Sequence, residues 1–404
     1  MISSEAVPFA KSGGLGDVIG SLPKQLNQSG ADVRVMLPLY QSIRKKYGSQ
    51  LTFLCDFTVE LSWRHLYCGL YQLDHEGVTY YFLDNEQYFK REGLYGYYDD
   101  GERFGFFSMA SMVSLRYLEY QPEVLHCHEW QTALVPVYLK TVFQKDPAYS
   151  HLKTVFTIHN IEYQGKFDPS ILKDVFGIDY FFQGLLNYHG GINLLKAAIV
   201  CCDRLTTVSR TYAQELLHPY FAHGLDPIIR ENQYKFSGIV NGIDTELYNP
   251  QKDPYIAHNY STRTIAKKWE NKAELQRMLE LSENPDAPLI AIITRLASHK
   301  GVDLILRVFQ EILDTGAQFV VLGTGERRYE QFFLDQSYHH TGQVAAAICF
   351  AQELSHKIYA GADLLLMPSE IEPCGISQLI AMRYGTIPIV RETGGLSDTV
   401  TAFN

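Results

Sequence analysis

Three features are scarce in this sequence: excess positive charge, paired cysteines and long apolar runs. The 404 residues carry a formal net charge of −10, which argues against a general nucleic-acid binder or a protein attracted to acidic membranes. A local basic pocket for phosphate groups is still compatible with that charge. No apolar run is long enough to span a bilayer, and the N-terminal pattern predicts no signal peptide.

Motifs for metal binding and for nucleophilic catalysis are also missing. The seven cysteines form no C-x-x-C pair, which predicts reduced thiols and a cytoplasmic location. His126, His128 and Glu129 in the stretch HCHEW could be metal ligands, but no pattern such as HExxH accompanies them. No DxD-like carboxylate pair and no Ser-His-Asp order is evident. We therefore expect no metal and no cofactor, so that cations would have to hold any phosphate groups.

Chain length and hydrophobic patterning predict two α/β domains. Short apolar runs such as VLHCH, TVFTIH and RLTTVS alternate with helical patterns, and a second series of the same kind begins near residue 289. This alternation is typical of doubly wound parallel sheets. We assign residues 1–240 to the first domain, 241–262 to a linker and 263–404 to the second domain.

Parts of the chain depart from that regular alternation. Residues 51–83 are rich in aromatic and aliphatic side chains with short polar turns, which predicts an antiparallel hairpin insertion. Residues 87–104 combine aromatics, glycines and charges and are expected to form an exposed loop near a site. Only residues 1–6 are available for a first strand, and the chain stops at Asn404 as a helix begins, so we expect both ends to be clipped.

The stretch KSGGLGD, Lys11 to Asp17, predicts a phosphate site in the first domain. Gly13 and Gly14 permit positive φ and close approach of a ligand, and the apolar residues that follow recur at helical spacing. A helix N-terminus offers free N–H groups and partial positive charge, to which Lys11 adds a cation. The alternative interpretation is a tight strand-to-helix turn without a ligand.

A near-copy of this stretch, ETGGLSD, lies at the other end of the chain, Glu392 to Asp398. It also follows a short apolar run that predicts a buried strand. Two similar turns predict two similar α/β halves that face one cleft. A ligand with a diphosphate would then be held by helix N-termini.

Charged residues at other strand ends are consistent with such a ligand. Arg295 and Lys300 in TRLASHKG lie at a strand end and just before a helix, which favours a diphosphate grip over paired surface cations. The turn LGTGE, with Gly323, is a weaker nucleotide-binding candidate. Glu370 and Glu372 in SEIEPCG could bind sugar hydroxyls, or could simply favour a helix start.

His159 and Asn160 end the strand TVFTIH, where a polar pair in an apolar context indicates a site. Ligands in doubly wound sheets bind beyond the carboxyl ends of the strands. The stretches HCHEW and HNIEYQG both follow predicted strands at such ends.

Seven motifs in order together resemble the bacterial glycogen synthase and plant starch synthase family: KSGGLGDV, HCHEWQTALVPVYL, TIHNIEYQG, VNGID, TRLASHKG, MPSEIEPCG and RETGGLSD. The resemblance spans nearly the whole chain. It implies a GT-B glycosyltransferase, with two Rossmann-like domains and the active site in the cleft. It also implies retaining transfer of glucose from ADP-glucose to the non-reducing end of an α-1,4-glucan, with no nucleic-acid or membrane partner.

The resemblance also assigns roles to individual residues. It implies that Lys11 meets the donor phosphates, that Arg295 and Lys300 hold the diphosphate, that Glu372 contacts the transferring glucose and that His159 lies beside the anomeric centre. It places Glu129 at a sugar-binding position and Phe350 where a ring would stack on adenine. The other donor-binding positions it implies are Gly13, Gly14, Asp17, Asn160, Asn241, Gly323, Cys374, Gly375, Thr393, Gly394, Gly395 and Leu396.

Three residues depart from the pattern of the family. Glu129 replaces the usual Asp and is one methylene longer, and Glu370 and Glu392 stand where the family commonly has Arg. The family also continues past Asn404 with further helices. Two alternatives therefore remain open: a UDP-sugar transferase of the same fold, and an inactive fragment that binds glucan or nucleotide sugar.

Overall fold

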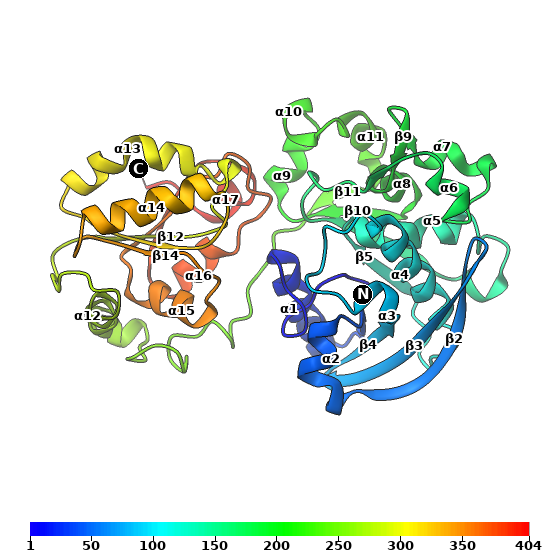
Figure 1. Ribbon diagram of the computed structural model, residues 1–404, viewed down its shortest axis with the longest axis horizontal. Coiled ribbons are helices and arrows are strands. Elements are labelled where there is room, and N and C mark those ends of the chain that lie inside the picture. The colour runs from blue at the N-terminus through cyan, green and yellow to red at the C-terminus, as the bar shows by residue number, and fades with distance from the viewer. Residues whose placement is uncertain (404) are drawn as a thin grey trace. The chain divides into compact units, whose positions relative to one another are not determined.

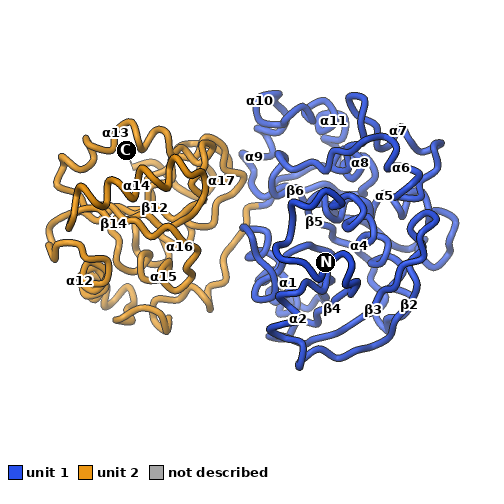
Figure 2. The backbone as a smooth tube through the Cα atoms, viewed as in Figure 1, with its two compact units in different colours: residues 1–239 blue, residues 240–404 orange. Residues whose placement is uncertain are grey.

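The computed structural model describes residues 1–403 and consists of two compact units (Figures 1 and 2). The first is Met1–Ile239 and the second is Val240–Asn404, whose last residue lies outside the described part. Among the helices of the described residues, none is long and apolar enough to cross a membrane.

The first unit is built on parallel strands in the order β11-β10-β6-β5, followed across a one-residue bridge by β1-β4-β3-β2. Ile2 makes that bridge, because it pairs in parallel with both Cys127 of β5 and Met36 of β1. The first strand expected from the sequence is therefore a single bridging residue. The parallel strands are β1 Val35–Pro38, β5 Val124–His128, β6 Lys153–Ile158, β10 Arg204–Thr207 and β11 Phe236–Gly238.

The predicted antiparallel insertion is confirmed. Strands β2 (Thr52–Leu61), β3 (Arg64–His75) and β4 (Val78–Asp84) pair in antiparallel fashion, and β4 joins the parallel strand β1. The second half of β2 alternates between exposed and buried residues, as expected for a sheet with one solvated face.

The segment 87–104 is an exposed loop only in part: residues 90–99 form a loop in which Glu92, Gly96 and Tyr98 are exposed, whereas both ends are helical and largely buried. Its polar and aromatic residues fold around Arg103, whose guanidinium is fully buried, pairs with Asp100 and donates to the carbonyl oxygens of Tyr88 and Leu94. A buried cation must be paired and hydrogen-bonded, and these partners come from the segment itself.

The remaining elements of the first unit are short strands and helices. A small antiparallel sheet contains β7 Lys166–Phe167, β9 Gly191–Asn193 and β8 Asn187–Tyr188. The helices are α1 Gly14–Gln28, α2 Gln41–Tyr47, α3 Glu86–Phe89, α4 Asp100–Ser114, α5 Leu134–Lys140, α6 Ile171–Asp174, α7 Gln183–Leu186, α8 Leu194–Cys201, α9 Arg210–Glu215, α10 Pro219–Ala222 and α11 Asp226–Glu231.

The second unit is a parallel sheet in the order β14-β13-β12-β15-β16, with helices on both faces (Figure 1). Neighbouring residues of one strand face different cores: Ala291 packs in one cluster and Ile292 in the other. Both faces of the central strands are covered, which explains their near-continuous apolar sequence. The strand predicted to be buried before the second glycine turn, Ile387–Val390, is instead an edge strand in which Ile387 and Ile389 are exposed. The elements are α12 Lys268–Met278, β12 Leu289–Ile293, α13 Val302–Asp314, β13 Gln318–Leu322, α14 Arg327–His339, β14 Val344–Ala347, α15 Gln352–Gly361, β15 Leu364–Met367, α16 Ser377–Arg383, β16 Ile387–Val390 and α17 Gly394–Thr399.

The segment 241–262, which we expected to be a linker, packs on the second unit. Tyr248, Ile256 and Tyr260 are buried in one of its two cores. The buried carboxylate of Asp253 accepts hydrogen bonds from Tyr384 and pairs with His356 Nδ1 at 2.7 Å. Buried apolar area and a buried polar network both attach this segment to the domain.

Candidate active site

Four polar residues meet at the carboxyl ends of β5 and β6 in the first unit. The Nδ1 atom of His128 lies 3.0 Å from Nε2 of His159. One carboxyl oxygen of Glu129 accepts the backbone N–H of His159 and, at 2.9 Å, that of Asn160. The three predicted site residues Glu129, His159 and Asn160 are thus brought together.

The backbone of Glu129 is strained. Its φ of 65° and ψ of 170° lie in a region that is almost confined to glycine and costs roughly 1–3 kcal/mol for other residues. The buried carboxyl group compensates by capping the end of β6, and burial raises its pKa to about 8 despite the two N–H donors. In this structure Glu129 therefore holds the backbone of the loop that carries His159.

The carboxyl group of Glu5 holds the backbone of the first glycine turn. Buried Glu5 accepts the backbone N–H of Ser12 at 2.5 Å and that of Gly13 at 3.3 Å, and also the hydroxyl of Tyr95 at 2.7 Å. Lys11 pairs with Asp17 at 2.7 Å. Part of the predicted anion-binding capacity of this turn is therefore satisfied within the unit.

Gly13 does not have the positive φ that we expected. Its φ is −161°, which is extended backbone open to any residue. A Cβ atom at Gly13 would meet nothing within 4 Å. What the glycine provides here is open space beside the N-terminus of α1.

In the second unit, the predicted cation and carboxylate form an ion pair, in which Glu372 is buried and Lys300 is half-buried. Lys300 Nζ lies 2.8 Å from Glu372 Oε2, and Ser369 Oγ donates to the same oxygen at 2.9 Å. Arg295 is exposed and makes no ion pair with any described residue. Lys300 precedes α13 and Glu372 follows β15, and because β12 and β15 are neighbours these loops meet at one sheet edge.

The second glycine turn is forced by close packing. Gly394 has a φ of +45°, and a Cβ atom at Gly395 would lie 2.3 Å from backbone atoms of Cys374. Two of the N–H groups that we expected to bind phosphate are used within the unit: Gly395 donates to Glu372 at 3.1 Å and Leu396 to Thr393 at 3.0 Å.

Gly323, in the second unit, is also explained by packing. A Cβ atom at Gly323 would lie 1.9 Å from the carbonyl oxygen of Thr294, so the turn LGTGE is glycine-rich because β12 runs on beside it. Gly375 has a φ of +74°.

The remaining predicted site residues of the second unit include a buried thiol and an exposed ring. Burial raises the pKa of Cys374 to about 11, with the backbone of Asn241 as hydrogen-bond donor. Phe350 is 80% exposed.

Comparison with known proteins decides the family. The family model of the starch synthase catalytic domain matches residues 1–231, and that of glycosyl transferases group 1 matches residues 277–404. The chain is 49% identical to the glycogen synthase of Anoxybacillus flavithermus, over 100% of the chain and 84% of that protein. It is also 49% identical to the glycogen synthase of Geobacillus thermodenitrificans, over 99% of the chain and 83% of that protein. The chain belongs to the glycogen synthase and starch synthase family.

A solved structure of the same family confirms the fold class. The catalytic domain of Starch Synthase IV from Arabidopsis thaliana, bound to ADP and acarbose, superposes with a TM-score of 0.92. The match has 35% sequence identity and covers 100% of this chain and 84% of that one. The predicted GT-B fold and glycogen synthase type of glycosyltransferase are therefore confirmed, as is the family resemblance.

Sequence reasoning missed three residues that support these family motifs: Glu5, Ser369 and the hydrogen-bonding role of His128. Ser369 and His128 stood inside the quoted motifs, and Glu5 is the only charged residue before Lys11. In residues 1–403, no group of three metal-ligating side chains is placed to hold a metal ion.

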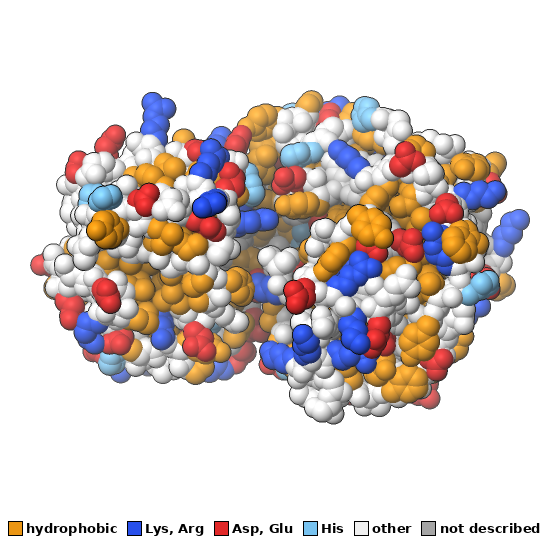
Figure 3. Space-filling view, in the orientation of Figure 1, with side chains coloured by type: hydrophobic (Ala, Val, Ile, Leu, Met, Phe, Trp, Pro, Cys, Tyr) orange, Lys and Arg blue, Asp and Glu red, His pale blue; other side chains and the backbone are white. Residues whose placement is uncertain are grey.

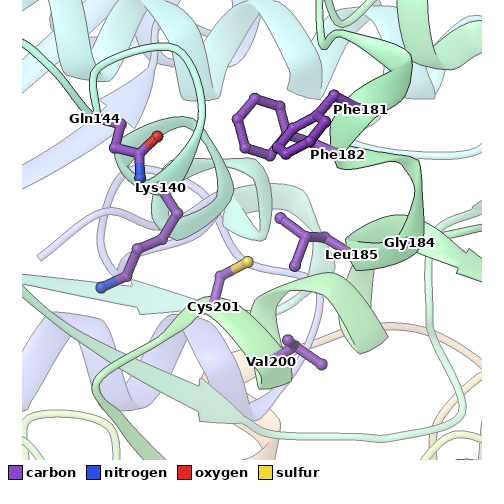
Figure 4. A pocket seen from close by; sticks show the side chains of 8 residues that line it. All are labelled: Lys140, Gln144, Phe181, Phe182, Gly184, Leu185, Val200 and Cys201. Carbon is purple, nitrogen blue, oxygen red and sulfur yellow. The ribbon is translucent and has the colours of Figure 1, made fainter.

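A cavity in the first unit is lined by other residues. It has a volume of about 480 Å³, and Phe181 and Phe182 lie side by side over it in Figure 4. Its lining contains none of the predicted site residues and consists of Lys140, Gln144, Phe181, Phe182, Gly184, Leu185, Val200 and Cys201.

Proposed function

We propose that the protein transfers glucose from ADP-glucose to the non-reducing end of an α-1,4-glucan, with retention of configuration. The observation that carries the proposal is the arrangement at one sheet edge of the second unit: half-buried Lys300 paired with buried Glu372, with the exposed Arg295 five residues earlier in the same loop. Two cations suit a departing diphosphate. The ADP and acarbose in the Arabidopsis relative support a nucleotide and a glucan-like ligand.

In this mechanism the protein stabilises charge and positions the reactants. Arg295 and Lys300 neutralise the negative charge that develops on the diphosphate as it leaves, and Glu372 orients both Lys300 and the transferring glucose. The departing phosphate takes the proton of the acceptor hydroxyl on the same face of the sugar. This role needs no pair of acid and base carboxylates of the kind used by glycoside hydrolases.

The two units take different parts in the proposal. The first, assigned as residues 1–240, is the acceptor side and supplies Lys11, Gly13, Gly14, Asp17, Glu129, His159 and Asn160. The second, assigned as residues 263–404, binds the nucleotide sugar. Its residues are Arg295, Lys300, Gly323, Phe350, Glu372, Cys374, Gly375, Thr393, Gly394, Gly395 and Leu396, together with Asn241 from the preceding segment.

The surface and the thiols are consistent with this role. On the face shown in Figure 3, acidic and basic side chains are interspersed on each unit, as expected for a protein with no polyanionic partner. The seven cysteines are free thiols in the described chain, which supports the cytoplasmic location that we propose.

The test is incorporation of labelled glucose into glycogen from ADP-glucose or from UDP-glucose. We expect incorporation from ADP-glucose, whereas preference for UDP-glucose would establish the alternative donor. Binding of either donor without incorporation would establish the inactive binding protein.

Variants of the Lys300–Glu372 pair connect activity with geometry. Lys300→Ala and Glu372→Ala are each expected to lower turnover at least ~100-fold, because one charge-stabilising contact is worth roughly 3 kcal/mol in the transition state, while the circular dichroism spectrum is retained. Lys252→Ala, which breaks an exposed pair with Glu246 in the same unit, is the matched control. Near-normal rates in either test variant would contradict the assigned roles.

A further inference from the structure

The imidazole of His128 is held inside the first unit with a single hydrogen-bond partner. Its side chain is buried, and Nδ1 lies 3.0 Å from His159 Nε2. The other ring nitrogen, Nε2, is buried and has no partner among the described residues. Burial lowers the pKa of both rings, that of His159 to about 3. Both imidazoles are therefore neutral near pH 7, and one proton lies between the two facing nitrogens.

Two arrangements of protons are compatible with that distance. In the first, His128 Nδ1–H donates to His159 Nε2, and the unpartnered Nε2 of His128 carries only a lone pair. In the second, His159 Nε2–H donates to His128 Nδ1, and a buried N–H of His128 then has no acceptor. Orphaned buried N–H groups are rarer in proteins than unsatisfied acceptors, so the first arrangement is favoured.

We propose that His128 is a positioning residue that fixes the tautomer of His159. By donating from Nδ1, it leaves the proton of His159 on Nδ1, and His159 as a residue is half-buried rather than enclosed. His159 then presents a hydrogen-bond donor to a hydroxyl of the bound sugar. This inference rests on the proposed function, because His159 is the residue that we place beside the reacting glucose.

The surroundings of His128 hold its ring in the required orientation. The ring of His126 lies 4.0 Å away, centroid to centroid, and His126 Nε2 is itself 2.7 Å from Thr157 Oγ1. The carbonyl oxygen of His128 accepts the hydroxyl of Thr132 at 2.9 Å. The tilted ring contact and the backbone contact leave Nδ1 of His128 directed at His159, and within residues 1–403 His126 makes no hydrogen bond to His159.

Nitrogen NMR of the protein labelled with ¹⁵N-histidine tests the proposal directly, without substrate. We expect His159 to have a protonated Nδ1 and an unprotonated Nε2 between pH 6 and 8. In His128→Leu the preference is expected to be lost, and in the control His126→Gln it is expected to remain. A His159 ring protonated at Nε2 in the wild type would overturn the proposal, as would an unchanged tautomer in His128→Leu.

Kinetics then separate positioning from a structural role. His128→Leu is expected to lower kcat by ~10- to 100-fold with little change in KM for the donor. His128→Asn, whose amide nitrogen takes the place of Nδ1, is expected to recover most of that loss. No recovery together with an intact fold would contradict the proposal. If the NMR result is as expected but no glucosyl transfer occurs in any form, the proposed function fails while the hydrogen bond between the histidines stands.

Discussion

The two glycine turns have almost the same sequence, but they are built on different physical grounds. The first, before α1, is held from outside by the carboxyl group of Glu5, and Gly13 faces open space. The second, before α17, is pressed against the backbone of Cys374, with Gly394 at positive φ. The helices also differ, with 15 residues in α1 and six in α17. A shared motif therefore does not imply a shared reason for its glycines.

The charged groups beside the turns differ in the same way. Lys11 and Asp17 form a pair with side chains 31% and 20% exposed, whereas Lys300 and Glu372 are 19% and 9% exposed. Water screens the charges of the first pair more strongly than those of the second, because the first pair is the more exposed of the two. The second unit thus holds the more consequential pair, and its free cation, Arg295, adds to the charge there.

The largest difference between the two turns is expected when one methyl group is added to each of them. Gly395→Ala forces Cβ against the Cys374 backbone, and we expect a loss of about 3 kcal/mol in the unfolding free energy of the second unit, together with loss of activity. Gly13→Ala is expected to cost no more than about 1 kcal/mol, the difference between glycine and alanine at an N-cap. Urea unfolding monitored in each unit measures both. Equal costs would mean that the turns are equivalent.

Removal of the Glu5 carboxyl group tests how the first turn is held. Glu5→Ala leaves the N–H groups of Ser12 and Gly13 without a partner, and we expect a cost of roughly 2 kcal/mol. Glu5→Gln keeps an acceptor oxygen and is expected to cost less than half as much. Tyr95→Phe, which removes only the third donor, is the control. Hydrogen exchange at Ser12 and Gly13 gives the readout, and unchanged protection in Glu5→Ala would contradict this role.

Much of this architecture could be predicted because it depends on local pattern. The central strands β12 and β13 of the second unit are covered on both faces, so their composition alone marks them. Lys300 and Glu372 follow strands that lie side by side. The pairing of Glu5 with the first turn could not be predicted, because no periodicity marks a carboxyl group that is buried for its hydrogen bonds. The sequence suggests that Gly323 contacts a nucleotide. In the structure this glycine is required because the backbone of Thr294 comes close to it, and a contact between separate strands cannot be recognised from local sequence.

In the segment 241–262, buried residues were predicted to lie at the surface. Its polar, proline- and asparagine-containing composition predicts surface chain, yet Tyr248, Ile256 and Tyr260 are buried in the second unit. The three are spaced without helical or strand periodicity, so the pattern that reveals most buried residues is missing. Asp253 adds a buried carboxylate whose partners, His356 and Tyr384, are more than a hundred residues away.

The buried carboxyl groups of the two units should respond differently to pH. Glu129 has no cation partner among the described residues, and burial raises its pKa from 4.5 to about 8. The folded state then holds a proton that the unfolded state releases. The stability of the first unit should therefore fall as pH rises from about 4.5 through 8, by at most ~1.4 kcal/mol per pH unit. In the second unit, burial raises the pKa of the Asp253 carboxyl group but its hydrogen bonds with His356 and Tyr384 lower it further, so the net shift is downward and its contribution to stability is lost as the pH falls.

Hydrogen exchange of the amides in β5 and β6, measured from pH 5 to 8 and corrected for intrinsic exchange rates, tests this prediction. Glu129→Gln keeps an acceptor for the N–H groups of His159 and Asn160 but cannot ionise, so its pH dependence should be flatter. Equal slopes in the wild type and Glu129→Gln would assign the effect to another group.

The smallest expected effect concerns the exposed pair beside the first turn. Asp17→Asn removes the partner of Lys11, and because the pair is partly solvated we expect a change of at most ~0.5 kcal/mol in stability. Under the proposed function, Lys11 is then free to meet the donor phosphates without first leaving a carboxylate, so KM for ADP-glucose should fall at low salt and converge with the wild-type value at high salt. We expect Glu5 to hold the turn, because its carboxyl group is buried whereas the Lys11–Asp17 pair is partly solvated. A stability loss in Asp17→Asn as large as that in Glu5→Ala would contradict this expectation and would mean that the pair holds the turn.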